Sequence, residues 1–235
     1  MQALPLAAGL AVCLAGVQLG NWQVRRAEEK AELSERIAHF AAAPAVPFSS
    51  AAAAGVPAEW QRVTLEGDWL PQGGVFLDNR VHEGRPGYHV LTPLRLASGE
   101  VVLVKRGWVG AGVDRSRLPE VAGGLGVARI EGVVRRPEDK PFTLAREAGA
   151  GRLWQFLDLS AYRRAFGLPV ADFVMQQTSM EADGLVRDWP RPDAGVDRHR
   201  GYAAQWYGLA SVAAGMTGLY LWRNRRSGSM KSIAS

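Results

Sequence analysis

Apolar residues are concentrated at the two ends of the chain. The first apolar run extends from Ala3 to about Gly20 without a charge, and only Pro5 and Gln18 fall outside Ala, Leu, Val, Gly and Cys. About 18 helical residues rise roughly 27 Å, close to the hydrocarbon thickness of a bilayer, about 30 Å. The run therefore predicts a transmembrane helix at 3–21.

A second uncharged run, from Ala203 to Trp222, is about as long but less apolar. Three polar residues dilute it, namely Gln205, Ser211 and Thr217. Its aromatic residues lie near its two ends, where amphipathic rings favour the membrane interfaces; they are Trp206, Tyr207, Tyr220 and Trp222. This pattern predicts a second transmembrane helix at 203–222.

Each run has an alternative interpretation, a cleaved signal peptide for the first and a buried core helix for the second. A signal peptide normally has a basic n-region and a small-residue cleavage site, whereas Met1 and Gln2 are uncharged and bulky or basic residues follow the run: Trp22, Gln23, Arg25 and Arg26. The second run is followed by the cations of a typical cytoplasmic tail, Arg223, Arg225, Arg226 and Lys231. Two spans then place residues 24–200 outside the cytoplasm.

The segment between the runs predicts one extracytoplasmic domain. Residues 25–42 mix apolar and charged positions and are expected to continue the first helix, and residues 41–54, with two prolines and four consecutive alanines, are typical of a linker. The predicted organisation is a cytoplasmic N-terminus at 1–2, a transmembrane helix at 3–21, a membrane-proximal helix and linker at 22–58, a β-rich domain at 59–190, a pre-span segment at 191–202, a transmembrane helix at 203–222 and a basic cytoplasmic tail at 223–235.

Short extended segments separated by glycine and proline predict the β-rich domain. The expected strands are 60–70, 75–79, 88–96, 100–109, 127–135, 154–157 and 171–177, with a helix at 160–166. The turn Ser98-Gly99 joins two of them into a hairpin. The predicted fold class is an α+β membrane protein in which two transmembrane helices flank a mostly antiparallel sheet or partial barrel.

Charge and cysteine content narrow the function. The chain has 28 Lys and Arg against 23 Asp and Glu, and four of the cations lie in the tail, so the rest is nearly neutral. Without a basic stripe that carries interleaved aromatics, a nucleic-acid partner is not expected. The only cysteine, Cys13, lies in the first run, so the domain has no disulfide and must be stabilised by packing.

Sequence motifs of catalysis are missing. The chain has no phosphate-binding glycine loop, nucleophile elbow, His-Glu-x-x-His or paired cysteines. The glycines of 107–112 follow a strand without the dinucleotide-binding pattern and predict a turn. His82 and His89 are seven residues apart, which no metal site specifically requires, so they are interpreted as surface or turn histidines. The protein is not expected to be an enzyme.

His199 stands out because it immediately precedes the second run, where an extracytoplasmic domain would meet lipid. If this segment is helical, His199, Tyr202 and Trp206 occupy positions i, i+3 and i+7 on one face. A neutral imidazole flanked by aromatic rings can be an axial ligand of a haem iron. The alternative is an interfacial aromatic belt with one polar neighbour.

Three ordered motifs resemble the signature segments of the surfeit locus protein 1 family. They are Leu19-Gly20-Asn21-Trp22-Gln23-Val24-Arg25-Arg26 with Lys30, Leu103-Val104-Lys105-Arg106-Gly107-Trp108-Val109, and the segment from His199 to Leu209. The likeness extends over nearly the whole chain, including 132–135 and 154–159. It departs from the family pattern at Asp197, Lys105 and Gly110, which the fold should tolerate.

The resemblance implies a cytochrome oxidase assembly factor with two spans, which binds haem a transiently and aids its insertion into the large subunit of the oxidase. Carried over by motif, His199 is the axial ligand of the haem iron, and Tyr202 and Trp206 are its cofactor-binding companions. The family-motif residues with structural roles are Gly20, Trp22, Gln23, Arg26, Arg106, Gly107, Trp108 and Gln205. The implied partners are the oxidase large subunit, its assembly proteins, haem a synthase and lipid.

Two alternatives remain, a scaffold that docks oxidase subunits without binding haem and an extracytoplasmic hydrolase. The short segment before the first run carries no transit peptide, which favours a bacterial inner membrane with the domain in the periplasm. Small-residue patterns in the spans, Gly16-x-x-x-Gly20, Ser211-x-x-x-Gly215 and Ala214-x-x-x-Gly218, are expected to let the helices approach each other or helices of the oxidase.

Overall fold

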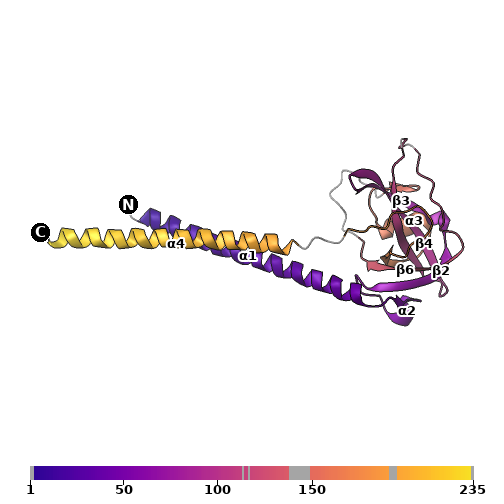
Figure 1. The fold of residues 1–235 in the computed structure, drawn as a ribbon, viewed down its shortest axis with the longest axis horizontal. Helices are drawn as coiled ribbons and strands as arrows, with labels where there is room; N and C mark the ends of the chain where they lie inside the picture. Colours follow the sequence, from indigo (N-terminus) through magenta and orange to yellow (C-terminus); the bar gives the residue numbers. More distant parts are fainter. Residues whose placement is uncertain (1–2, 113, 116, 138–148, 191–194, 234–235) are drawn as a thin grey trace. The chain divides into compact units, whose positions relative to one another are not determined.

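The computed structural model describes residues 3–112, 114–115, 117–137, 149–190 and 195–233, with no side chains described at 3, 150 or 225–233. It divides into two compact units, which we call the helix pair (Met1–Arg36 and Arg191–Ser235) and the β domain (Ile37–Pro190) (Figure 1). The predicted N-terminus at 1–2, part of the pre-span segment and the end of the basic tail lie outside the described residues.

The β domain is built around a closed ring of strands. Its strands are β1 (Val46–Pro47), β2 (Arg62–Trp69), β3 (Val75–His82), β4 (Arg85–Leu96), β5 (Val101–Gly110), β6 (Val127–Arg135), β7 (Gly149–Ala150), β8 (Leu153–Trp154) and β9 (Val170–Gln177). The sheet order is β1-β2-β6-β9-β5-β4-β3-β8-β7, and β2 also pairs with β4. Strands β2, β6, β9, β5 and β4 therefore close into a small barrel.

The barrel closes where β2 and β4 lie very close together. Trp69, Asp68 and Gly67 pair with Leu94, Arg95 and Leu96. A Cβ atom on Gly67 would lie 2.1 Å from the carbonyl oxygen of Arg95, which no side chain can accommodate. Glycine at this position thus permits the contact that converts an open sheet into a barrel.

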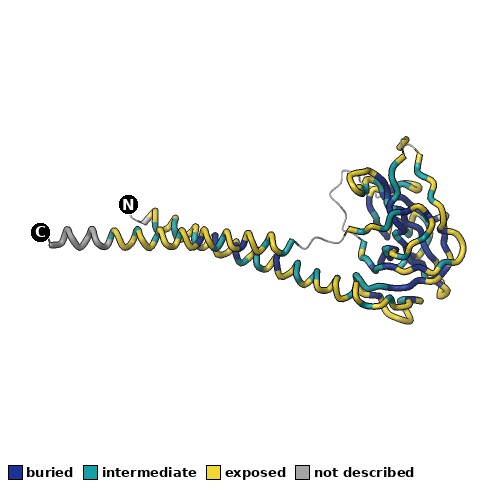
Figure 2. Tube along the Cα trace, in the orientation of Figure 1, coloured by how far each residue is buried: buried dark blue, intermediate teal, exposed yellow. Residues whose placement is uncertain are grey.

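Both faces of β5 are buried. Val102 and Val104 belong to a cluster of barrel-strand side chains that includes Phe173, whereas Val101 and Leu103 pack into a second cluster with α3 (Leu159–Phe166). Burial on both faces explains why the first four residues of β5, 101–104, are all apolar instead of alternating with polar residues. Figure 2 shows this buried interior in dark blue.

The short helix α3 is fixed by local and long-range bonds. Asp158 caps its N-terminus by accepting a hydrogen bond from Ala161 N at 2.9 Å, and Gly167 ends it in the left-handed conformation with φ of 64°. The Tyr162 hydroxyl donates to the carbonyl oxygen of Gly73, at the end of the 3-10 helix η1 (Pro71–Gly73), at 2.5 Å. Burial raises the pKa of this hydroxyl.

The sequence-based strands and the hairpin at Ser98-Gly99 are largely confirmed. The sheet is mostly antiparallel, as expected, but it is mixed because β1–β2, β3–β8 and β5–β9 pair in parallel. Two segments differ from the expectation. The expected linker 41–54 contains β1 and the short helix α2 (Ala51–Ala54). The expected strand 154–157 shrinks to β8, and β7 was missed, because both are two-residue pairings too short to show a period of two.

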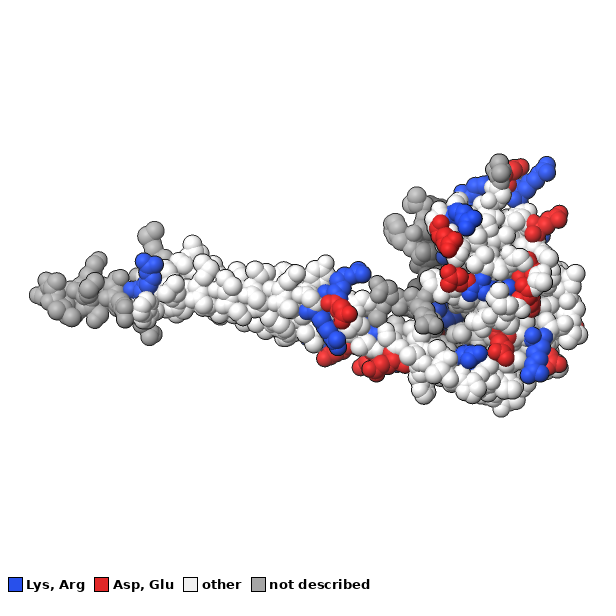
Figure 3. Space-filling view, viewed as in Figure 1, with Lys and Arg blue, Asp and Glu red and all other residues white. Residues whose placement is uncertain are grey.

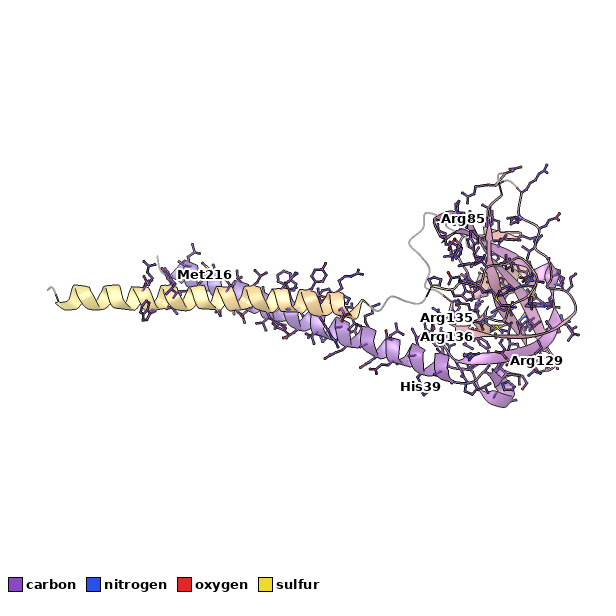
Figure 4. All side chains as sticks on the ribbon, viewed as in Figure 1. His39, Arg85, Arg129, Arg135, Arg136 and Met216 are labelled. Carbon is purple, nitrogen blue, oxygen red and sulfur yellow. The ribbon has the colours of Figure 1, made fainter. Side chains whose placement is uncertain are left out.

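The helix pair consists of α4 (Val196–Ile233) and most of α1 (Ala3–Ala42), whose residues after Arg36 fall in the β domain. Among the helices that the structure describes, α1 is the one whose length and apolar composition, over Leu4–Ala42, suffice to cross a membrane. Polar and aromatic residues keep α4 below that level. Large apolar side chains are exposed along both helices, among them Leu10, Leu14, Leu209 and Val212. Met216 is another, and Figure 4 shows it on α4.

Candidate functional site

The contacts within the helix pair define an antiparallel register. A Cβ atom placed on Gly9 would meet Thr217, and one placed on Gly16 would meet Ala210. As the residue number rises along α1, the facing number along α4 falls by a similar amount. The middle of α1, near residue 23, therefore lies beside the start of α4.

Glycine on α1 allows the two helices to approach closely. A Cβ on Gly16 would lie 2.9 Å from the Ala210 Cβ, and one on Gly20 would lie 2.6 Å from the Tyr207 ring. The small-residue pattern expected in the first span is thus used against α4. Gly215 and Gly218, by contrast, meet nothing within 4 Å, so the patterns expected in the second span do not contribute to this interface.

Two polar contacts join the helices where α4 begins. The Tyr207 hydroxyl donates to Asn21 Oδ1 at 2.6 Å. The Nδ1 atom of His199 lies 2.7 Å from Gln23 Oε1, and Gln23 is buried. The pairing between these residues could not be read from the sequence, because it depends on the register of two helices that are far apart along the chain.

The three residues proposed for haem lie on the first turns of α4 but differ in exposure. His199 and Trp206 are half-buried, whereas Tyr202 is 46% exposed. No ring–ring contact joins the three side chains in the described structure. Helical spacing therefore places them along one side of α4, while only His199 has a hydrogen bond to α1 through its side chain.

The family-motif residues near His199 are distributed over both sides of the helix contact. Gly20 and Gln23 face α4, whereas Trp22 is 44% exposed and has the Arg26 guanidinium 5.9 Å from its ring centroid. Arg26 also forms an ion pair with Glu29 at 2.8 Å. Gln205 is exposed on α4.

The donor set around His199 suits a haem better than a bare metal ion. In the part of the chain that the structure describes, no group of three or more His, Cys, Asp or Glu side chains could hold an ion. A haem iron already has four porphyrin nitrogens and requires only an axial ligand from the protein. His199, which is half-buried, is the side chain of this helix pair that could supply one such imidazole ligand.

The motif Arg106-Gly107-Trp108 on β5 anchors the segment that follows β9. Arg106 is buried and donates to Asp183 Oδ2 at 2.8 Å and to the Ala122 carbonyl at 2.9 Å. A Cβ on Gly107 would lie 2.6 Å from the Leu185 Cβ. The backbone of Trp108 exchanges two hydrogen bonds with Val186, at 2.8 and 2.9 Å.

Asp183 accepts hydrogen bonds from two buried guanidinium groups. Arg187 donates to its two carboxylate oxygens at 3.0 and 2.5 Å, and Arg106 also donates to Oδ2. Burial by itself would raise the pKa of the Asp183 carboxyl. The hydrogen bonds from Arg187 and from Leu185 N, together with the charges of Arg187 and Arg106, outweigh burial and lower this pKa.

His89 is not the surface or turn histidine expected from the sequence. It lies within β4 and is half-buried, with its ring centroid 5.3 Å from that of Trp189. Burial, followed by the charges of Lys105, Arg80 and His82, lowers the pKa of His89 to about 2. The sequence suggested exposure because a glycine-rich turn precedes it, whereas Trp189, one hundred residues later, covers it.

Comparison with known proteins identifies relatives along nearly the whole chain. The SURF1 family matches residues 10–211, a range that includes parts of both helices and the β domain. Surfeit locus protein 1 of Takifugu rubripes is 27% identical over 225 residues, 87% of this chain and 89% of that protein. A SURF1-like protein of Rickettsia bellii is 24% identical, covering 83% and 81%. Cytochrome oxidase assembly protein SHY1 of Saccharomyces cerevisiae is 26% identical, covering 66% and 42%.

Removing the charge of Asp183 should strongly destabilise the β domain. Asp183→Asn leaves the buried guanidinium groups of Arg106 and Arg187 with only the more distant carboxylate of Glu181, at 3.8 and 3.9 Å. Breaking a buried ion pair in this way costs about 3–5 kcal/mol. Denaturant unfolding of the full chain in detergent micelles, followed by tryptophan fluorescence, measures the loss. Asp172→Asn is the control, because Asp172 pairs with Arg163 but is 80% exposed. Equal small effects of both variants would contradict the assigned role of Asp183.

Acid should weaken the β domain through His89. The pKa of His89 is depressed in the folded protein, so its contribution to the free energy of unfolding is present above about pH 6.5. This contribution is lost below that pH, because the unfolded chain takes up the proton and the folded chain does not. Lowering the pH from 7 to 5 should cost about 2 kcal/mol through this group. Unfolding curves at both pH values should show a smaller pH dependence for His89→Gln than for wild type or His39→Gln. An unchanged dependence in His89→Gln would refute this origin.

Proposed function

The chain belongs to the SURF1 family, and on that premise we propose that it is a non-enzymatic assembly factor for a haem–copper cytochrome oxidase. The name of the related yeast protein, a cytochrome oxidase assembly protein, supports this assignment. The lack of a recognisable catalytic motif in the sequence agrees with a role in assembly rather than in turnover. The partners that this role requires are the oxidase large subunit and its other assembly proteins, with haem a synthase as the source of cofactor.

The register of the helix pair supports a topology with two spans. The sequence has no charged residue from 3 to 24 or from 201 to 222, and the contacts of Gly9 and Gly16 place these two stretches side by side. Figure 3 shows a long uncharged surface along the helix pair, with charged side chains at either end. A bilayer of about 30 Å would be crossed by both helices at the same depth.

The aromatic residues of α4 explain how a less apolar helix can still span. Tyrosine and tryptophan rings are favoured at the interfaces even though they reduce average hydropathy, and those of α4 lie near the two ends of its uncharged stretch. The basic residues after 222 favour cytoplasmic ends, which would place the β domain in the periplasm of a bacterium.

In this topology His199 lies at the outer surface of the membrane, and we propose that its imidazole would hold a transiently bound haem a. Because Nδ1 is bonded to Gln23, Nε2 is the ring nitrogen that would bind the iron. Tyr202 and Trp206 would provide ring surfaces along the same side of α4 for the macrocycle. A single, incompletely buried ligand would suit transfer, because ligands on the oxidase could reach the iron and replace it.

The topology predicts opposite accessibilities for the β domain and the tail. With Cys13 replaced by alanine, cysteines introduced as Glu66→Cys and Ser229→Cys are treated with a membrane-impermeant maleimide on spheroplasts. Glu66→Cys should react in intact spheroplasts, whereas Ser229→Cys should react only after lysis. Both variants in detergent provide the control for reactivity. Labelling of Ser229→Cys before lysis would eliminate the second span.

The haem assignment predicts an absorption spectrum. Protein purified from cells that make haem a should carry the cofactor, and His199→Ala should lose most of it. His39→Ala is the control, because His39 is an exposed histidine on α1 (Figure 4). A wild type without haem, or His199→Ala with equal haem, would defeat the ligand assignment. Unchanged haem content of the oxidase in His199→Ala cells would favour a scaffold that docks oxidase subunits.

A further inference from the structure

We propose that Gln23 is a positioning residue that fixes the tautomer of His199, so that Nε2 presents its lone pair away from α1. This proposal builds on the assignment of His199 as a haem ligand, but its physical basis is independent of haem. It concerns the hydrogen bond between α1 and α4 and the proton that this bond holds.

The hydrogen bond determines which ring nitrogen carries the proton. Gln23 Oε1 lies 2.7 Å from His199 Nδ1, and a carbonyl oxygen can only accept a hydrogen bond. With the amide oriented so that Oε1 faces the ring, Nδ1 is the donor. In a neutral imidazole only one nitrogen is protonated, so Nε2 retains its lone pair. No other hydrogen bond involves the His199 ring in the residues that the structure describes.

Gln23 lies where packing alone would favour an apolar residue. Gly16, Gly20, Gln23 and Ala27 follow each other at helical spacing along the side of α1 that faces α4, and Gln23 and Ala27 are both buried. A buried amide is costly unless it is hydrogen-bonded. His199 supplies that bond, which gives the polar side chain at this position a specific role.

The surrounding helix contacts hold the two groups at bonding distance. The glycine contacts at Gly16 and Gly20 set the separation of the helices. The amide is thus presented by a supported helix face rather than by a loop. This arrangement keeps the imidazole plane and its tautomer fixed before a ligand arrives.

The alternative is that the Gln23–His199 bond only links the helices, as polar side chains commonly do in membranes. Asn21 separates the two roles, because its bond to Tyr207 also links the helices but does not touch His199. A structural role alone predicts similar effects of Gln23→Leu and Asn21→Leu. A positioning role predicts that only Gln23→Leu changes the state of the imidazole.

The decisive experiment is nitrogen NMR of the haem-free full-length protein in detergent micelles. The chain has four histidines, so selective ¹⁵N labelling of histidine and loss of one signal set in His199→Ala identify His199. Wild type at a pH where the ring is neutral should show the Nδ1–H tautomer, and Asn21→Leu should retain it. Gln23→Leu should shift the population toward Nε2–H. An Nε2–H tautomer in wild type, or no change in Gln23→Leu, would overturn the proposal.

Gln23→Glu decides the question if Gln23→Leu fails to fold. A carboxylate at this position remains an acceptor, so the Nδ1–H proton should persist and its resonance should move downfield because the bond is stronger. Loss of that proton in a folded Gln23→Glu protein would also contradict the proposal.

Haem titration then connects the tautomer to the proposed function. Removing the hydrogen-bond partner of a ligating histidine typically weakens metal binding about 10- to 100-fold. Gln23→Leu should therefore bind haem a about 10- to 100-fold more weakly, whereas Asn21→Leu should bind within a few-fold of wild type. Equal affinities of Gln23→Leu and wild type would overturn the positioning role. A wild type that shows the Nδ1–H tautomer but binds no haem would defeat the haem assignment alone.

Discussion

The close approach of α1 and α4 at Gly16 and Gly20 is the constraint on which the helix pair depends. A side chain larger than hydrogen at either glycine would overlap Ala210 or the Tyr207 ring. With the helices this close and antiparallel, Gln23 reaches His199 and Asn21 reaches Tyr207. The same register aligns the two uncharged stretches, and this alignment connects the packing of the pair to the proposed topology.

In the β domain, two glycines allow segments to pack closely, and one buried cluster of charged side chains holds them in place. Gly67 lets β2 meet β4 and so closes the barrel, while Gly107 lets the segment after β9 lie against β5. Arg106 and Arg187 share Asp183 in the interior, which fixes that segment by charge as well as by backbone bonds. Arg106 and Gly107, which lie in a family motif, thus have packing contacts within the β domain. These contacts make both residues poor candidates for binding a cofactor.

Motifs and spacing predicted much of the candidate site but not its geometry. The placement of His199 ahead of an uncharged run, with aromatics at i+3 and i+7, singled it out, and the resemblance assigned it to haem. The sequence could not assign Gln23 to His199, because 176 residues separate them and only the helix register joins them. It also misjudged His89, since its cover by Trp189 arises from a contact across the barrel surface.

The sequence by itself determined the end helices, the main strands and the hairpin at Ser98-Gly99, because apolar periodicity, charge-free length and turn residues act over short distances. Only the tertiary structure decided which strands close the barrel, which pairings are parallel and which α1 side chain binds His199. These outcomes depend on contacts between segments far apart in the chain. From the sequence alone, a glycine that allows two segments to approach closely cannot be distinguished from a glycine in a loop. The two end helices were therefore predictable as elements, whereas the polar contact between them was not.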